Sequence, residues 1–330
     1  MKCIGRMRRI ISFILLTVMA CSLSGCGSLA YDMAYSVDSD VSSFNVISGQ
    51  DTGTAAPFAS NLCVVTENVE EGTEADLSEA TAAILFSLND RGVVYAQNVH
   101  DTLNPASLTK VMTALVVLKY GSLDQKLTAT SAVTITEPGA QLCGIEPGDT
   151  MTMDQALRIL LIYSANDVAM LIAENVGGTV EHFVEMMNEE AARLGATNTH
   201  FVNPHGLTDP NHYTTAYDLY LIFNEAIRYE TFNEIIHMAG YQTVYYDKNG
   251  SEKTFDRSSS NQYLRAGSDY SAPANVTVIG GKTGTTTAAG HCLMLLSRDV
   301  NGAPYISVVM GTPSTKALYT AMTELLEEIP

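Results

Sequence analysis

Apolar runs separated by turn residues predict β-strands near both ends of the chain. An apolar run over 82–88 is followed by Asn-Asp-Arg-Gly and then by apolar residues 93–95. This pattern predicts two strands joined by a turn. Near the other end, the segments 291–298 and 305–311 flank an Asn-Gly dipeptide, which is typical of a hairpin. A further short strand is predicted over 276–279.

Helical periodicity dominates the middle of the chain. The segment 107–120 is apolar on nearly every side, which predicts a buried helix. Further helices are predicted over 154–163, 167–176, 180–194, 216–228 and 315–328. Strands at both ends with helices between them predict an α+β fold, an α/β sandwich. In this fold an antiparallel sheet built from both termini lies beside a mainly helical subdomain.

The N-terminal part of the chain has a different pattern. Basic residues within the first nine positions precede an apolar run over 10–23, which is short for a membrane span but typical of an export signal. The run ends in Leu-Ser-Gly-Cys26, which resembles a bacterial lipobox. The resemblance implies a signal peptide over 1–25 and a lipid on Cys26. Residues 26–56 are rich in Ser, Asp, Thr and Gly and predict a flexible tether, with the folded domain over 57–330.

This pattern places the protein outside the cell, at the outer face of the cytoplasmic membrane as a lipoprotein. Two or three acyl chains would hold it there stably, where one would be marginal. A plain secretory signal and an uncleaved anchor are the alternatives. Lipid on Cys26 is therefore the expected membrane partner.

Composition and charge exclude several classes of function. The 330 residues are 46% hydrophobic and 16% charged, which suits a chain with a sizeable core. The net charge of −18 would repel a phosphate backbone, so we expect no nucleic-acid partner. Seven His without an HExxH pattern disfavour a metal hydrolase, and we expect neither a metal nor another cofactor. Lipid on Cys26 would leave Cys63, Cys143 and Cys292, which we interpret as small buried or partly exposed residues whose pairing stays open.

The first candidate motif is Pro105-Ala106-Ser107-Leu108-Thr109-Lys110. Ser107 and Lys110 are three residues apart at the start of a predicted helix, so their side chains share one face. A serine hydroxyl needs a base to become nucleophilic. A lysine can be that base when burial lowers its pKa, and the apolar helix offers such burial. The motif therefore predicts a serine nucleophile beside a lysine base.

The second candidate motif is Ser164-Ala165-Asn166, at the break between two apolar helices. The same Ser-x-Asn pattern begins at Ser43, Ser87 and Ser259. Ser43 lies in the predicted tether, Ser87 in a strand and Ser259 in a polar run. We choose Ser164 because a helix break lets side chains turn inward on a cleft. A simple helix connection capped by Asp167 is the alternative.

The third candidate motif is the segment 280–286, Gly-Gly-Lys-Thr-Gly-Thr-Thr, which we place directly after the strand over 276–279. Its glycines let another backbone approach closely. Lys282 offers a positive charge, and Thr283 and Thr285 offer hydroxyls for a carboxylate. A strand edge can also bind an extended peptide by strand addition. A glycine-rich turn without function is the alternative.

In this order, the three motifs resemble those of penicillin-binding proteins and class A β-lactamases. The chain is most similar to the D-alanyl-D-alanine carboxypeptidases over roughly residues 60–330, and the resemblance implies a β-lactamase/transpeptidase-like fold. The closer resemblance rests on the first and third motifs, on the Ala289-Gly290 pair, and on the segment 201–207, Phe-Val-Asn-Pro-His-Gly-Leu. We interpret His205 in that segment as a loop histidine held by packing rather than as a catalytic group.

The resemblance implies an acyl-enzyme mechanism on peptidoglycan stem peptides that end in D-Ala-D-Ala. Lys110 would deprotonate Ser107, whose backbone N–H would form an oxyanion hole with that of Thr285. Ser164 would pass a proton to the departing D-alanine. The implied substrate-binding residues are Asn166, Lys282, Thr283, Gly284 and Thr285.

β-Lactam antibiotics would be covalent inhibitors of such an enzyme. Three other readings stay open. A D,D-endopeptidase shares every motif. A β-lactamase would need a deacylating carboxylate, and the stretch 198–207 has no Glu. A non-catalytic wall-binding lipoprotein would not need the intact motifs.

Overall fold

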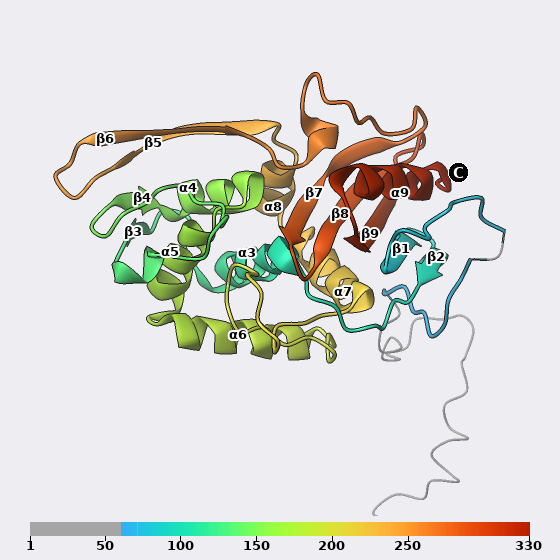
Figure 1. The fold of residues 1–330 in the computed structure, drawn as a ribbon, viewed down its shortest axis with the longest axis horizontal. Coiled ribbons are helices and arrows are strands. Elements are labelled where there is room, and N and C mark those ends of the chain that lie inside the picture. The colour runs from blue at the N-terminus through green and yellow to red at the C-terminus, as the bar shows by residue number, and fades with distance from the viewer. Residues whose placement is uncertain (1–60, 71) are drawn as a thin grey trace, which may run out of the picture. The chain divides into compact units, whose positions relative to one another are not determined.

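Strands from both ends of the described chain pair in one antiparallel sheet (Figure 1). The structure is a computed structural model that describes residues 61–70 and 72–330. These residues belong to one compact unit. The predicted signal peptide, lipidation at Cys26 and the tether lie outside the described residues, as do residues 57–60.

The main sheet has the strand order β2-β1-β9-β8-β7. Its strands are β1 (Ala82–Ser87), β2 (Gly92–Gln97), β7 (Thr277–Thr286), β8 (Gly290–Arg298) and β9 (Pro304–Thr312). All neighbours are antiparallel, and β1 from one end of the chain pairs with β9 from the other. The predicted sheet built from both termini is confirmed.

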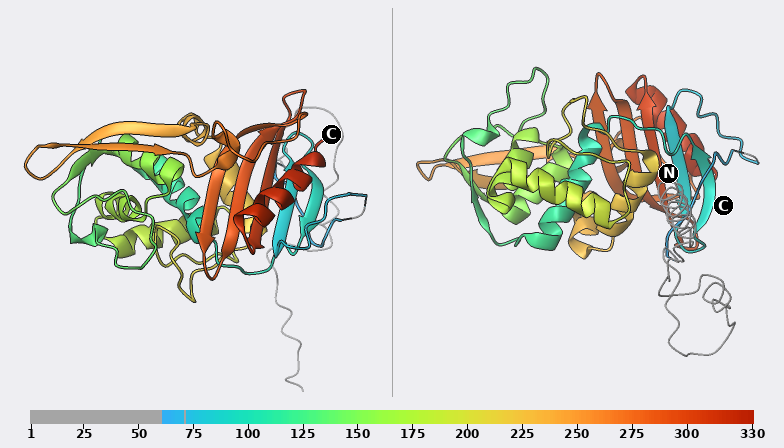
Figure 2. Two further views of the ribbon diagram at one scale, coloured as in Figure 1. Left: turned by 45° about the horizontal axis from the view of Figure 1, so that its top comes forward. Right: turned by 90° about the horizontal axis from the view of Figure 1, so that it is seen from below.

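Alternation along β1 explains how this sheet separates two cores. Ile84 and Phe86 point into one apolar cluster, whereas Ala83 and Leu85 point into a second one on the opposite face. Helix α9 (Thr315–Glu327) covers the second face, as Figure 2 shows, and the helical subdomain covers the first. Burial on both faces explains why β1 reads as a continuous apolar run.

The helical subdomain is arranged around α3 (Thr109–Tyr120), which packs against α5, α6 and α7. A short 3₁₀ turn, η1 (Ala106–Leu108), precedes α3 and carries Ser107. The other helical elements are α4 (Met153–Arg158), the π-helical turn η3 (Ile159–Tyr163), α5 (Asn166–Gly177), α6 (Val180–Arg193), α7 (Ala216–Ala226), α8 (Glu230–Ile236) and the 3₁₀ turns η2 (Ser131–Val133) and η4 (Gln262–Leu264). Among the described residues, no helix is both long and apolar enough to cross a membrane.

Two features differ from the sequence prediction. The prediction of a short strand over 276–279 is wrong in its length. Strand β7 continues to Thr286, so the glycine-rich motif lies within the strand and does not follow it. A Cβ at Gly281 would lie 1.9 Å from the carbonyl oxygen of Met294, so glycine lets β7 and β8 pair closely here. The helix predicted over 154–163 is α-helical only to Arg158 and continues as η3.

A second sheet was not predicted. It has the order β3-β4-β5-β6 and comprises β3 (Lys126–Thr128), β4 (Thr150–Thr152), β5 (Gly240–Tyr246) and β6 (Glu252–Ser258). The first two strands are three residues long, too short for an alternating pattern. The β5–β6 hairpin extends along the helical subdomain in Figure 1 and is largely exposed, so its polar sequence carries no core signal.

Candidate active site

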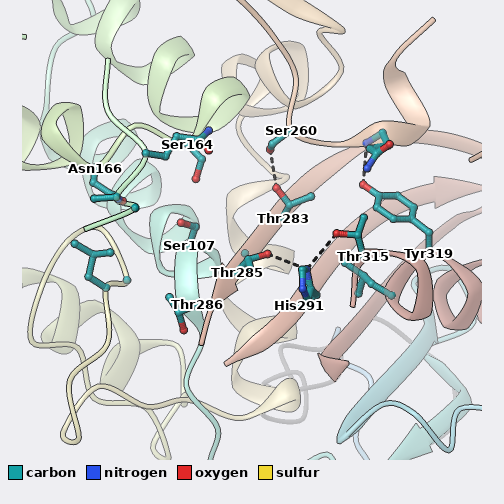
Figure 3. Close-up of a pocket in the computed structure, with 18 residues that line it drawn as sticks. Ser107, Ser164, Asn166, Ser260, Thr283, Thr285, Thr286, His291, Thr315 and Tyr319 are labelled. Atoms are coloured by element: carbon teal, nitrogen blue, oxygen red, sulfur yellow. Dashed lines mark hydrogen bonds between the residues drawn. The ribbon is translucent and has the colours of Figure 1, made fainter. Parts of the chain in front are cut away.

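All three predicted motifs line one cleft between the helical subdomain and the edge of the main sheet (Figure 3). Ser107 comes from η1, Ser164 from the break before α5, and Thr283 and Thr285 from β7. The cleft has a volume of about 360 Å³, within the range of small-molecule sites. None of the described residues that line it is an Asp or a Glu.

Ser107 and Lys110 form the predicted pair. The Lys110 Nζ donates to Ser107 Oγ at 2.9 Å, to Asn166 Oδ1 at 2.6 Å and to the carbonyl oxygen of His205 at 2.6 Å. Ala106 has a left-handed φ of 47°, so the backbone is strained immediately before the nucleophile. The three contacts fix the lysine nitrogen against the serine oxygen.

The electrostatic setting of Lys110 suits a base. The side chain is fully buried, and this burial lowers its pKa well below the ordinary value of 10.5. The nearby charge of Lys282 lowers the pKa further, while Asp167 opposes the shift. A lowered pKa favours the neutral amine, and only the neutral amine can accept the Ser107 proton.

Ser164 occupies a conformation that only the break between helices allows. It follows the π-helical turn with a left-handed φ of 75°, and its Oγ accepts a hydrogen bond from Lys282 Nζ at 2.9 Å. Lys282 also donates to the carbonyl oxygen of Thr283 at 2.8 Å. Burial lowers the pKa of Lys282 to about 7. Asn166 begins α5 and contacts Lys110, so the second motif connects the two lysines.

Strand β7 forms the opposite wall of the cleft. Thr283 Oγ1 donates to Ser260 Oγ at 2.6 Å, while Thr285 Oγ1 lies 3.3 Å from His291 Nδ1. A Cβ at Gly284 would lie 3.0 Å from the backbone nitrogen of Ser107. Glycine at this position therefore lets the strand lie directly against the nucleophile's backbone.

The segment 201–207 supports η1 from behind. Gly206 has a φ of +84°, and a Cβ there would lie 1.8 Å from the carbonyl oxygen of Ala106. Burial, followed by the charge of Lys110, lowers the pKa of His205 to about 3, so its ring is neutral. The ring Nδ1 accepts a hydrogen bond from the backbone nitrogen of Leu207. The contact of His205 with Lys110 is made by its backbone carbonyl oxygen, which accepts a hydrogen bond from Lys110 Nζ. Packing rather than acid–base chemistry accounts for His205, in agreement with its interpretation from the sequence.

The competing Ser-x-Asn matches are placed elsewhere. Ser87 ends β1 and donates to Asp90, and Ser259 accepts a hydrogen bond from the backbone nitrogen of Asn261. Neither residue lines the cleft, and Ser43 lies outside the described residues. Of the three matches among the described residues, only Ser164 lies with Ser107 in this cleft.

Several lining residues were not found from the sequence. They are Gln141, Ser260, Gln262, His291, Thr315, Leu318 and Tyr319. They come from loops, from η4, from the start of β8 and from the first turns of α9, and they belong to no short motif, so the sequence held no signal for them. The described cysteines Cys63, Cys143 and Cys292 form no disulfide, and no cluster of metal-ligating side chains occurs among the residues of known placement.

Comparison with known proteins identifies similar sequences of one family. A model of the D-alanyl-D-alanine carboxypeptidase family, Peptidase_S11, matches residues 69–314. D-alanyl-D-alanine carboxypeptidase DacF of Bacillus subtilis is 34% identical over 76% of this chain and 61% of its own length. The DacA carboxypeptidase of Haemophilus influenzae is 32% identical over 81% of this chain and 66% of its own. The chain thus spans less than two thirds of the length of these relatives.

Solved structures share the fold across nearly their whole length. The Streptomyces K15 DD-transpeptidase superposes with a TM-score of 0.69 and 26% identity, covering 76% of this chain and 96% of that one. A D-alanyl-D-alanine carboxypeptidase from Mycobacterium tuberculosis gives a TM-score of 0.65 and 28% identity, covering 76% of this chain and 90% of its own. The predicted α+β, transpeptidase-like fold is confirmed.

Proposed function

The chain belongs to the D-alanyl-D-alanine carboxypeptidase family, and we propose that it is a serine-type carboxypeptidase that removes the terminal D-alanine from peptidoglycan stem peptides. One observation carries this proposal. Ser107 is hydrogen-bonded to the fully buried Lys110 and faces strand β7, which carries the buried Lys282 and two threonines. Such a site can form an acyl-enzyme next to a bound carboxylate.

The acylation step uses Ser107 and Lys110. Neutral Lys110 takes the proton from Ser107 Oγ, which attacks the carbonyl carbon between the two D-alanines and forms a tetrahedral intermediate. The backbone N–H groups of Ser107 and Thr285 stabilise its oxyanion. The close packing of Gly284 against the Ser107 nitrogen supports this role, because it brings the two backbones together.

The leaving group departs through the Ser164 side of the cleft. As the C–N bond breaks, Ser164 passes a proton to the D-alanine amine, and its contact with Lys282 supports that transfer. Lys282, Thr283 and Thr285 bind the terminal carboxylate, with Gly284 giving the room. Asn166 holds the substrate amide and Lys110. Water then hydrolyses the ester, which restores the Ser107 hydroxyl and releases the shortened peptide.

In this proposal β-lactams acylate Ser107 and inhibit the enzyme, because the acyl group is released only slowly. Penicillin keeps its leaving group tethered in the site, so deacylation needs a well-placed base. No carboxylate is among the described residues that line the cleft. The nearby Asp167 accepts hydrogen bonds from the backbone nitrogens of Cys143 and Gly144, which turns its carboxylate away from such a role. This observation favours a carboxypeptidase over a β-lactamase.

We further propose that the protein is exported and held at the membrane by lipid on Cys26. The basic start, the apolar run and the lipobox support this location. Cys26→Ser is expected to release the protein from the membrane or to leave the precursor unprocessed. A mature N-terminus found at another residue by mass spectrometry would contradict the lipid anchor.

Two measurements test the activity. Free D-alanine released from a stem-peptide mimic reports turnover, and intact-mass spectrometry reports the lifetime of the penicillin adduct. We expect rapid D-alanine release, a long-lived adduct, and loss of both signals in Ser107→Ala. A penicillin adduct that clears within seconds without D-alanine release would favour a β-lactamase. No adduct and no turnover would favour a non-catalytic wall-binding protein.

A further inference from the structure

A side pocket beside the catalytic cleft contains two arginines that the mechanism above does not use. Arg257, in β6, and Arg265, directly after η4, line this side pocket together with Tyr163. Gln141 and Ser260 line both the side pocket and the catalytic cleft. The two hollows therefore adjoin each other at these two residues.

The guanidinium group of Arg257 is held in place without an ion pair. It lies over the ring of Tyr163, 5.7 Å from the ring centroid, and donates to the carbonyl oxygen of Asp256 at 2.7 Å. Within the described part of the chain, no carboxylate forms an ion pair with Arg257 or Arg265. In a chain with a net charge of −18, two unpaired cations at one pocket form a local site for an anion.

Arg265 also acts on the wall of the catalytic cleft. Burial raises the pKa of Tyr319 to about 12, and the positive charge of Arg265 opposes that rise. Tyr319 lines the catalytic cleft. The guanidinium group of Arg265 therefore lies near a residue of the catalytic cleft.

Ser260 identifies which end of the cleft the side pocket adjoins. Its backbone nitrogen donates to the carbonyl oxygen of Ile162 at 2.9 Å, and its Oγ accepts from Thr283. Figure 3 shows Ser260 and Thr283 on the same side of Ser107 as Ser164, whereas Thr286 lies at the other end. The proposed function places the leaving group on the side of Ser164 and Thr283. The side pocket therefore continues the leaving-group end of the cleft.

We propose that Arg257 and Arg265 form an outer anion subsite that binds a second carboxylate on the leaving group, beyond the carboxylate of the scissile residue. This inference rests on the proposed function. Guanidinium groups match carboxylates in a bidentate geometry. The ligands of this subsite are acidic leaving groups larger than D-alanine, such as the acceptor branch of a cross-linked stem peptide. The bonds formed and broken at Ser107 are those of the carboxypeptidase reaction, and the departing amine takes the same proton from Ser164.

Peptides that differ only in the leaving residue test the subsite. D-Glu and D-Gln have nearly the same size and differ in one carboxylate, while D-Ala is the reference. Wild-type protein is expected to show a kcat/KM roughly tenfold higher for the D-Glu peptide than for the D-Gln peptide, the scale of one charge-assisted hydrogen bond. In the double variant Arg257→Gln/Arg265→Gln the ratio falls close to one, while D-alanine release changes by less than about twofold.

Arg298→Gln is the matched control. Arg298 is an exposed arginine at the end of β8 and lines neither hollow, and its substitution removes one positive charge, as each single substitution in the double variant does. We expect the D-Glu preference to persist in this variant. Affinities of Ser107→Ala for the D-Glu and D-Gln peptides, measured by calorimetry, repeat the comparison without turnover.

Three results would contradict the proposed subsite. The first is no preference for the D-Glu peptide in the wild type, and the second is a preference that survives in the double variant. The third is an equal loss of kcat/KM in the double variant for all three leaving groups. The last result would mean that the two arginines bind the carboxylate of the scissile residue or are needed for folding. D-alanine release by the wild type tests the proposed function separately, and the calorimetric comparison still decides the subsite when turnover is absent.

Discussion

Lys282→Met is expected to stabilise the protein at neutral pH while inactivating it. Burial shifts the pKa of Lys282 from 10.5 to about 7, which corresponds to about 5 kcal/mol of destabilisation when the side chain is charged in both states. The sign follows from the lowered pKa. The penalty is fully present below pH 7 and disappears as the pH rises to 10.5, where the unfolded chain also loses the proton.

The methionine also removes the hydrogen bonds to Ser164 Oγ and to the carbonyl oxygen of Thr283. At about 1 kcal/mol each, this loss is about 2 kcal/mol at every pH. The variant should therefore gain about 3 kcal/mol at pH 6 and lose about 2 kcal/mol near pH 10.5. The difference between the two pH values corresponds to a change in Tm on the order of 10 °C.

Thermal unfolding of variant and wild type at pH 6 and pH 10.5 measures this difference. Lys316→Met is the control, because Lys316 is exposed on α9 and its substitution should shift Tm equally at both pH values. D-alanine release by Lys282→Met should fall at least about tenfold, since a charge-assisted bond to the substrate carboxylate is lost. If the Tm change of Lys282→Met does not depend on pH, the conclusion that the buried ammonium group of Lys282 destabilises the protein is refuted.

Three further outcomes are expected. Ser164→Ala should lower kcat by roughly 10²–10⁴-fold, and unchanged kcat would contradict the proton relay. Gly206→Ala should abolish labelling, because the new Cβ would lie 1.8 Å from the Ala106 carbonyl oxygen, and normal labelling kinetics would count against the tight support of η1. Glu190→Ala should lower the free energy of unfolding by about 2 kcal/mol, because this buried carboxylate accepts charge-assisted hydrogen bonds from the partly exposed Lys119 and Arg193. Urea denaturation that shows no change would argue against these pairs.

The sequence predicted most of the main sheet and the longer helices because their apolar patterns are long, but it did not predict the seven-residue α8. The run over 82–88 and the flanks of Asn301-Gly302 became β1, β8 and β9, within about two residues at each end. β7 was underestimated because its glycines, which allow close pairing with β8, also break the apolar pattern. The second sheet was missed because its strands are either very short or exposed.

The motif side chains of the candidate site were predictable, but its other lining side chains and its backbone contacts were not. Motif spacing identified Ser107, Lys110 and Lys282, and the helix break identified Ser164. The carbonyl oxygen of His205 is a hydrogen-bond partner of Lys110, but a backbone atom leaves no trace in residue identity. The left-handed conformation of Ser164 likewise depends on the π-helical turn before it, which no sequence pattern indicated.

The pairing of β1 with β9 determines the order in which this protein can fold. Ile84 faces Val308, so β1 has only β2 beside it until β9 has been synthesised. An apolar strand with an open edge can pair with other chains, and such long-range closure slows folding. We expect the native sheet to form only after β9 has been synthesised. A version truncated before β9 would expose the edge of β1, and aggregation is its expected fate.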